Sequence, residues 1–261
     1  MNNLANNRPK GLSRQAIRIW GLVFVVAGAI GQGVIMNVLL GMQSMTGAQM
    51  ETMLEQNERN ITLAVFALLL QMASACAIPI FTFLLVDGYQ RTSSVKNYIL
   101  RVAGLALVSE IPYNLAMSGV WFDFKTRNPI FAMVLGMVML VIYHYYSGKK
   151  IKNILIRAMV FLLGFVWVAM LQIEHGASII IMISTIWALR KNRSWQVLGG
   201  CAAMFVCSGI PSMNPTYWLA PVIFLAVHFY NEEIGEDNKI FNYAAYPVIL
   251  LAVGLIAKYA M

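Results

Sequence analysis

Long apolar runs separated by short polar connections dominate the hydrophobic pattern of the chain. The runs occupy residues 17–41, 61–86, 96–118, 128–146, 153–171, 176–190, 194–210, 216–230 and 240–260. A helix that crosses a bilayer needs about 20 predominantly apolar residues, and its backbone polar groups must be satisfied within the helix. The pattern therefore predicts an all-α fold, a polytopic integral membrane bundle of about nine transmembrane helices.

Two segments lie outside these runs. Residues 1–16 are polar and basic and are expected to form a cytoplasmic tail, because no signal-peptide cleavage pattern follows the first run. Residues 17–261 are then a single transmembrane domain. Residues 42–60 carry spaced glutamates and methionines, and this connection is either a solvated link or a short amphipathic helix on the outer surface.

The composition excludes a soluble globular protein, since 59% of the residues are hydrophobic and 11% are charged, with a mean hydropathy of +0.68. The formal net charge of +8 fits the excess of Lys and Arg in cytoplasmic connections. All basic residues except four fall on one set of alternate connections; the four are Arg59, Lys125, Arg127 and Lys258. This split predicts a multi-pass protein of the plasma (inner) membrane, with a cytoplasmic amino terminus, an external carboxyl terminus, lipid around it and no nucleic-acid partner.

Acidic side chains within or beside the apolar runs are the first candidates for chemistry, because a carboxylate in the bilayer is costly unless it is paired or wetted. Glu110 lies in the third run beside Pro112, where a local kink is expected to line a cavity. Glu174 and His175 lie in the turn after the fifth run. Histidine titrates near neutral pH and can act as a general base beside an orienting carboxylate. Glu110, Glu174 and His175 are therefore the candidate catalytic residues, the alternatives being a packing role for Glu110 and an exposed loop position for His175.

Polar amides form a second group of candidates. In the predicted topology they lie in the outer half of the membrane, where they are expected to line one substrate pocket: Gln32, Asn37, Asn114, Asn128 and Gln172. The alternative is that these side chains satisfy one another in hydrogen bonds between helices. The three cysteines show no metal-ligand spacing, and no metal site is expected.

Two arginines, Arg91 and Arg101, flank the turn between the second and third runs on the predicted cytoplasmic side. A guanidinium group matches phosphate oxygens in a bidentate way, so the two residues are candidates for binding the phosphates of a cofactor. The alternative is that they are topogenic charges near anionic lipid headgroups.

Several motifs resemble the TraX family, polytopic membrane proteins named for acetylation of the amino terminus of conjugative pilin. The motifs are residues 78–81 (IPIF), 87–89 (DGY), 96–101 (KNYILR), 109–114 (SEIPYN), 230–231 (YN) and 246–247 (YP), with Gly235 and Lys239. The chain is also similar to wider transmembrane acyltransferases that take acetyl from coenzyme A. The resemblance implies acetyl-CoA as the donor if the protein is active.

The chain departs from the family pattern at the presumed chemical centre. Gly28 and Ala29 stand where the resemblance implies an Asp-His pair, Ala75 where it implies arginine, and Ile249 where it implies histidine. Acetyl transfer needs a base and a group that stabilises the oxyanion, and these side chains supply neither.

Three functions follow. The first is a catalytically degenerate acyltransferase scaffold that binds a peptide, lipid or membrane-protein partner. The second is an active N-acetyltransferase or acyltransferase that modifies an exported peptide or pilin from acetyl-CoA, with a new base. The third is a transporter or exporter component with broken helices. A cation-lined path from Arg91 to the outer pocket favours the enzyme, whereas a core plugged by Leu, Ile and Phe favours the scaffold.

Overall fold

The computed structural model describes residues 11–209, 215–233 and 239–259, and these residues form helices without β-strands. α1 (Arg14–Ala29) continues directly into a π-helix, η1 (Ile30–Leu39). Two short helices follow, η2 (Met42–Ser44) and α2 (Gly47–Glu55). The remaining helices are α3 (Glu58–Ala75), α4 (Ala77–Arg91), α5 (Val95–Ser118), α6 (Ile130–Tyr145), α7 (Ile151–Met170), α8 (Gly176–Ala188), α9 (Arg193–Gly209), η3 (Pro215–Leu219), α10 (Ala220–Phe224), η4 (Leu225–Phe229) and α11 (Lys239–Tyr259).

Each predicted apolar run coincides with helical structure, but the helices differ in length. Five are long and apolar enough to cross a membrane: Arg14–Leu39, Glu58–Arg91, Val95–Ser118, Ile151–Met170 and Phe241–Tyr259. Three apolar helices are shorter: Ile130–Tyr145, Gly176–Ala188 and Tyr217–Phe229. The protein is thus an all-helical, membrane-type bundle, while the nine crossings and the orientation of the termini stay predictions.

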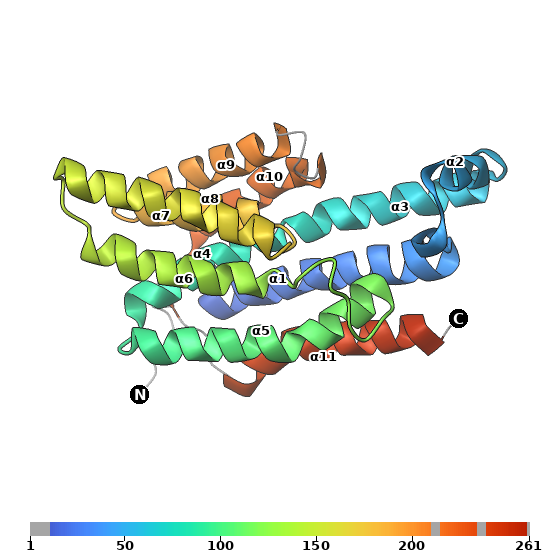
Figure 1. The fold of residues 1–261 in the computed structure, drawn as a ribbon, viewed down its shortest axis with the longest axis horizontal. Helices are drawn as coiled ribbons and strands as arrows, with labels where there is room; N and C mark the ends of the chain where they lie inside the picture. The colour runs from blue at the N-terminus through green and yellow to red at the C-terminus, as the bar shows by residue number, and fades with distance from the viewer. Residues whose placement is uncertain (1–10, 210–214, 234–238, 260–261) are drawn as a thin grey trace, which may run out of the picture.

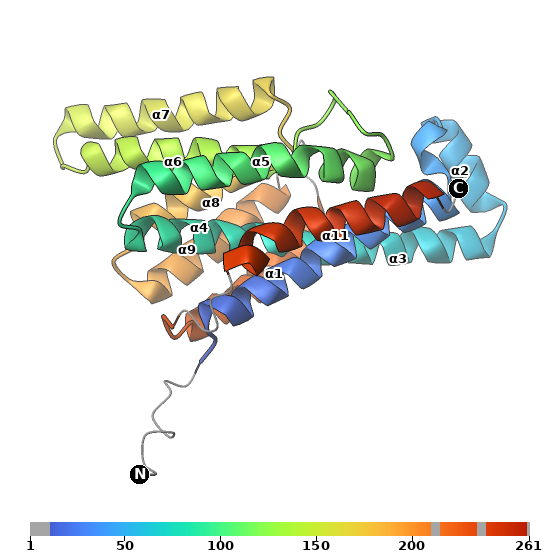
Figure 2. The ribbon, with the colours of Figure 1, turned by 90° about the horizontal axis from the view of Figure 1, so that it is seen from below.

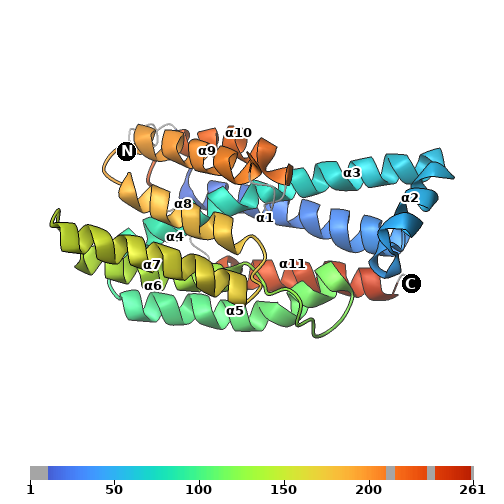
Figure 3. The same ribbon diagram turned by 45° about the horizontal axis from the view of Figure 1, so that its top comes forward.

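The helices run side by side along the long axis of the molecule (Figure 1). The α4–α5, α6–α7 and α8–α9 connections lie at the end where α1 begins, and α2 lies at the opposite end. We call these the basic end and the α2 end, because lysines and arginines crowd the first three connections. Seen from below, α5, α6 and α7 form one layer, and α1 and α11 run diagonally beneath it (Figure 2). α8 lies among the shorter helices and contacts α4, α6, α7 and α9 (Figure 3).

Local sequence signals explain several helix ends. The Ser13 side chain accepts a hydrogen bond from the Ala16 N–H, so α1 begins at Arg14, before the predicted boundary at residue 17. Ser94 caps α5 in the same way, and Gly119 ends α5 in the left-handed conformation with φ +65°. A capping box at Thr46 begins α2, so the 42–60 connection contains a helix.

Close packing of α5 against α11 and η1 organises the half of the bundle toward the α2 end. A Cβ added at Gly254 of α11 would lie 2.8 Å from the Ala116 backbone nitrogen, and Gly33 of η1 meets the Ala116 carbonyl from another side. Small residues allow such approaches between membrane helices. In contrast, α7 fully buries only Gly164 and Val168 and packs one face on the core through Val160, Phe161 and Phe165, so its opposite apolar face is available to lipid.

Candidate functional site

A cavity of about 700 Å³ lies between α1, α4, α5 and α11 and extends from the basic end toward the α2 end as far as Gln32 and Glu174. This volume is within the range of small-molecule sites. One face of α1 and η1 follows the cavity from the basic end toward the α2 end, through Arg14, Arg18, Leu22, Val25, Gly28 and Gln32. Eighteen helical residues rise about 27 Å, so the cavity extends over most of a bilayer thickness. Arginines line its basic end, whereas Leu, Ile, Val and Phe make up most of the lining between the two ends.

Four arginines line the cavity at its basic end: Arg14 and Arg18 from α1, Arg91 from α4 and Arg101 from α5. Arg91 and Arg101 are the two residues predicted to bind a phosphate-bearing cofactor, and the structure brings both to this mouth. From the sequence, Arg14 and Arg18 are expected only to help set the topology. Four guanidinium groups around one opening favour an anionic ligand.

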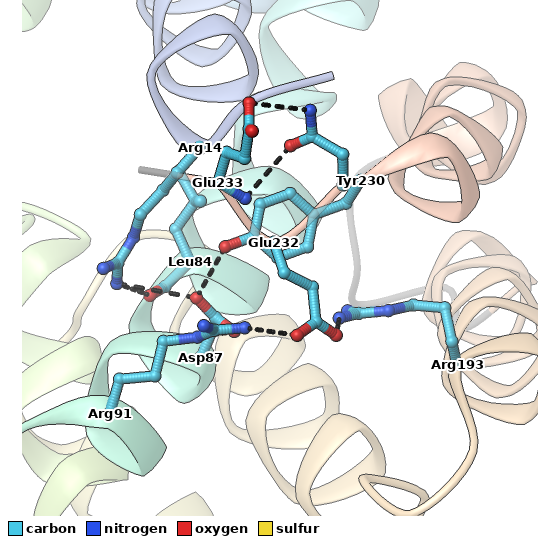
Figure 4. Close-up of polar contacts among 9 residues, drawn as sticks. Arg14, Leu84, Asp87, Arg91, Arg193, Tyr230, Glu232 and Glu233 are labelled. Atoms are coloured by element: carbon cyan, nitrogen blue, oxygen red, sulfur yellow. Dashed lines mark hydrogen bonds and ion pairs between the residues drawn. The ribbon is translucent and has the colours of Figure 1, made fainter. Parts of the chain in front are cut away.

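Asp87 contacts two of these arginines and Tyr230 at the cavity mouth (Figure 4). Its carboxylate lies 3.0 Å from Arg91 Nε and 3.8 Å from Arg14 Nη2, and it accepts a hydrogen bond from the Tyr230 hydroxyl at 3.1 Å. The Tyr230 hydroxyl therefore helps to hold the Asp87 carboxylate beside the two arginines.

Glu232 supplies a second carboxylate that pairs with Arg91. Its carboxylate bridges Arg91 at 3.1 Å and Arg193 at 3.5 Å (Figure 4), and its φ of +66° is a strained, left-handed conformation. The Leu12 N–H donates to the Phe229 carbonyl nearby, which fixes the start of the chain to this segment. Arg91 is thus engaged by protein carboxylates.

Arg101 has a different environment. Its Nε donates to the Asn97 carbonyl of its own helix at 3.2 Å, and its guanidinium lies 5.8 Å from the centroid of the Tyr98 ring. No acidic side chain pairs with it among the described residues. Arg14 Nε is buried and has no hydrogen-bond partner among the described residues, while Arg14 Nη2 donates to the Leu84 carbonyl and lies 3.8 Å from Asp87. Of these two arginines, Arg101 is the one that the described acidic residues leave without an ion pair at the cavity mouth.

The middle of the cavity is mainly apolar, and Tyr113 supplies a buried polar group there. The Tyr113 hydroxyl is buried without a hydrogen-bond partner among the described residues, although Tyr113 lines the cavity and is only 2% exposed. An unsatisfied buried hydroxyl costs about 1–3 kcal/mol, and such groups call for a ligand or a water. Gly28 and Ser74 lie opposite each other nearby and leave no base or cation at this level.

Glu174 and His175 line the cavity toward the α2 end. His175 is the N-cap residue of α8, with a left-handed φ of +57°, and its Nδ1 is hydrogen-bonded to the Tyr217 hydroxyl. Its Nε2 lies 3.6 Å from Glu174 Oε1. The Glu174 N–H donates to the Arg127 carbonyl at 2.9 Å, which anchors the turn to the connection before α6.

Three amides form a hydrogen-bonded chain between helices. Gln71 Nε2 donates to Gln32 Oε1 at 3.0 Å, and Gln32 Nε2 donates to Asn37 Oδ1 at 3.2 Å. Asn37 Nδ2 donates to the Met117 carbonyl at 2.8 Å. Gln32 and Asn37, five residues apart, meet because η1 is a π-helix, in which the backbone bonds also join residues five apart.

Five predicted residues are not part of the cavity lining: Asn37, which lies in the amide chain above, and four others. Glu110 pairs with Arg127 at 3.3 Å and accepts from the Asn128 N–H at 3.1 Å. Asn128 is fully buried, donates to the Ala106 carbonyl and caps α6. The remaining two are Asn114, which is buried on α5, and Gln172, which is exposed in the turn before α8. The structure therefore does not bring the five amides together in one pocket, and Glu110 does not reach His175.

Sequence reasoning missed Gln71 and Tyr113. Both stand in apolar helices, where a polar group is the available signal. That signal gives no direction, because the sequence does not say which helix face turns toward a cavity.

Comparison with known proteins gives one match. The model of the TraX protein family matches residues 32–257. No curated protein and no solved structure matches the chain. Ala75 and Ile249 lie inside the matched range, whereas Gly28 and Ala29 precede it.

Proposed function

The chain belongs to the TraX family, and from this premise we propose that it is a plasma-membrane acyltransferase that uses acetyl-CoA as donor. The acetyl group passes to an amine or hydroxyl that enters from the α2 end. The observation that carries the proposal is that one cavity is lined by arginines at one end and by Glu174 and His175 at the other. On this observation we place the enzyme above the degenerate scaffold, in the reverse of the order drawn from the sequence.

The donor end is supported by its charge. Acetyl-CoA carries several phosphate charges, and four arginines line this end of the cavity. Arg101 has no acidic partner among the described residues, whereas Arg14 lies 3.8 Å from Asp87. Arg91 would join them by exchanging Glu232 for phosphate, since the Glu232 side chain is 64% exposed and readily solvated. In the predicted topology this mouth opens to the cytoplasm, where acetyl-CoA is available.

The acceptor end supplies a proton acceptor. When the acceptor attacks the thioester carbonyl, its proton must leave and the coenzyme A thiolate departs. Glu174 and His175 are the lining residues at the α2 end with that capacity. Tyr113, between the two ends, can donate its hydroxyl hydrogen to the carbonyl oxygen as negative charge develops there.

The degenerate scaffold is the second candidate, favoured by the residues at Gly28, Ala29, Ala75 and Ile249. Gly28 lines the cavity, and Ala29 and Ala75 are buried. In this alternative the cavity binds a peptide, lipid or protein segment and no transfer follows. The transporter alternative stays a prediction, to be tested by flux through reconstituted vesicles.

Calorimetric titration of acetyl-CoA into the protein in nanodiscs separates these functions. Arg101→Ala is expected to weaken binding about ten-fold or more, because a hydrogen bond to a charged group contributes about 1.5–3 kcal/mol. Arg157→Ala is the matched control: Arg157 Nε also donates to a carbonyl four residues earlier, at 3.3 Å, but Arg157 lies outside the cavity. Absence of binding to the unmodified protein would overturn the proposal, and binding without transfer to any amine would leave the scaffold.

A further inference from the structure

The polarity of the amide chain from Gln71 to Asn37 is fixed at one end. The Met117 carbonyl can only accept, so the Asn37 side chain must turn its NH₂ group toward it. Asn37 then offers Oδ1 to Gln32, which must answer with Nε2. Gln32 in turn offers Oε1, and Gln71 must answer with Nε2. An amide flip at any single position would place two donors or two acceptors against each other.

This polarity leaves Gln71 Oε1 as the terminal group of the chain. Gln71 lines the cavity and is half-buried. Its Oε1 has no hydrogen-bond partner among the residues that the structure describes. The oxygen can only accept, so it selects a ligand group that carries an N–H or O–H.

The charge of the cavity wall around Gln71 narrows the class of ligand that its Oε1 would bind. At the α2 end the cavity is lined by Gln32, Gln71, Ser118, Glu174 and His175, among others, and Glu174 carries the only permanent formal charge of the lining there. A negative wall with an acceptor oxygen favours a cation that donates hydrogen bonds. Neutral alcohols would gain the hydrogen bond without the attraction.

We infer that Gln71 Oε1, oriented by Gln32 and Asn37, is a specificity-determining site for a protonated primary amine at the α2 end of the cavity. The inference deepens the proposed function, because the bound amine would be the acceptor, which must lose a proton to Glu174 or His175 before it attacks. Asn37 is a positioning residue, since it lies outside the cavity lining and acts through Gln32 and Gln71; Gln32 orients Gln71 and also lines the cavity.

Two cations of equal charge isolate the hydrogen bond. n-Butylammonium has three N–H donors, and N,N,N-trimethylbutylammonium has none, while both are attracted by Glu174. Binding of each to the full chain in nanodiscs is measured by saturation-transfer NMR titration, with empty nanodiscs subtracted. We expect the protein to prefer n-butylammonium by about ten-fold, and Gln71→Met to abolish the preference.

Gln196→Met is the matched control, because Gln196 is a buried glutamine on α9 that donates to the Ile186 carbonyl at 3.1 Å, away from the cavity. It should keep the preference. If Gln71→Met fails to fold, Gln71→Glu, which retains an acceptor oxygen, should keep or increase it. Equal binding of the two cations to the unmodified protein would overturn the inference, as would a preference that survives Gln71→Met.

Acetyl-CoA titration of the same samples keeps the two proposals separate. If the protein does not bind acetyl-CoA but still prefers n-butylammonium, the proposed acyltransferase function is refuted and the role of Gln71 is not. If the protein binds acetyl-CoA in a way that depends on Arg101 but shows no preference between the two cations, the role of Gln71 is refuted and the acyltransferase function is not.

Discussion

Replacing Glu110 by glutamine distinguishes a structural carboxylate from a chemical one. Glu110 accepts from Arg127 at 3.3 Å and from the Asn128 N–H at 3.1 Å, and it lies outside the cavity lining. Glutamine keeps one acceptor oxygen but loses the charge and the second acceptor. A hydrogen bond to a charged group contributes about 1.5–3 kcal/mol, and the Arg127 side chain, 35% exposed, is screened, so the pair itself adds at most about 1 kcal/mol.

The free energy of unfolding should therefore fall by about 1–3 kcal/mol in Glu110→Gln. Thermal unfolding in nanodiscs, followed by tryptophan fluorescence, measures the loss as a lower melting temperature. Acetyl-CoA affinity, and acetyl transfer from radiolabelled acetyl-CoA to n-butylamine per folded molecule, should stay close to the values of the unmodified protein. Both are measured below the melting temperature of the variant.

Glu174→Gln makes the same chemical change on the cavity wall. The Glu174 side chain is 39% exposed, and among the described residues its carboxylate lies 3.6 Å from His175 Nε2, so the melting temperature should change little. Transfer should fall about 100-fold or more if Glu174 takes or relays the proton. The reasoning is refuted if Glu110→Gln melts like the unmodified protein but loses transfer, or if Glu174→Gln unfolds early and retains it.

Two further predictions concern packing and topology. Gly254→Leu should lower the free energy of unfolding by about 1–3 kcal/mol through overpacking against α5, because even a Cβ there lies 2.8 Å from the backbone of Ala116; Gly104→Leu, where an added Cβ meets nothing within 4 Å, should melt unchanged. A cysteine replacing Lys125 should react with an impermeant maleimide added outside intact cells, and one replacing Lys149 only after lysis; the reverse pattern would invert the predicted topology.

The helices could be predicted from the sequence because the signal is strong and local. Every apolar run became helical, since a spanning backbone has to satisfy its own hydrogen bonds. The positions at which the helices break were harder to predict from the sequence. The second run became two helices that meet at Cys76, and the run at 216–230 divided into 3₁₀ and α segments around Pro221. Such breaks depend on neighbouring helices as much as on local residue types.

The site was predictable at its charged mouth and not in its interior. Arg91 and Arg101 stand out in sequence as basic residues beside a turn, and both line the cavity. Glu110 gave an equally strong signal, yet its partner Arg127 lies seventeen residues away in a connection whose course hydropathy does not fix. To identify Gln71 and Tyr113 as cavity residues, one must know how each helix is rotated about its axis, and this rotation is set by tertiary packing.

The separation of charge along the cavity bears on how two substrates would be accommodated. Arginines line one end and Glu174 lines the other. Two unit charges separated by about 27 Å, the rise of the helix from Arg14 to Gln32, would interact by about 0.6 kcal/mol at an effective dielectric constant of 20. This is below the energy of one charged hydrogen bond, so a phosphate-bearing donor and an ammonium acceptor would bind nearly independently. Any strong coupling between them must then arise in the apolar middle, where Tyr113 presents the buried hydroxyl that has no partner among the described residues. Chemistry in this cavity therefore depends on whether both ligands reach Tyr113, rather than on attraction between its two ends.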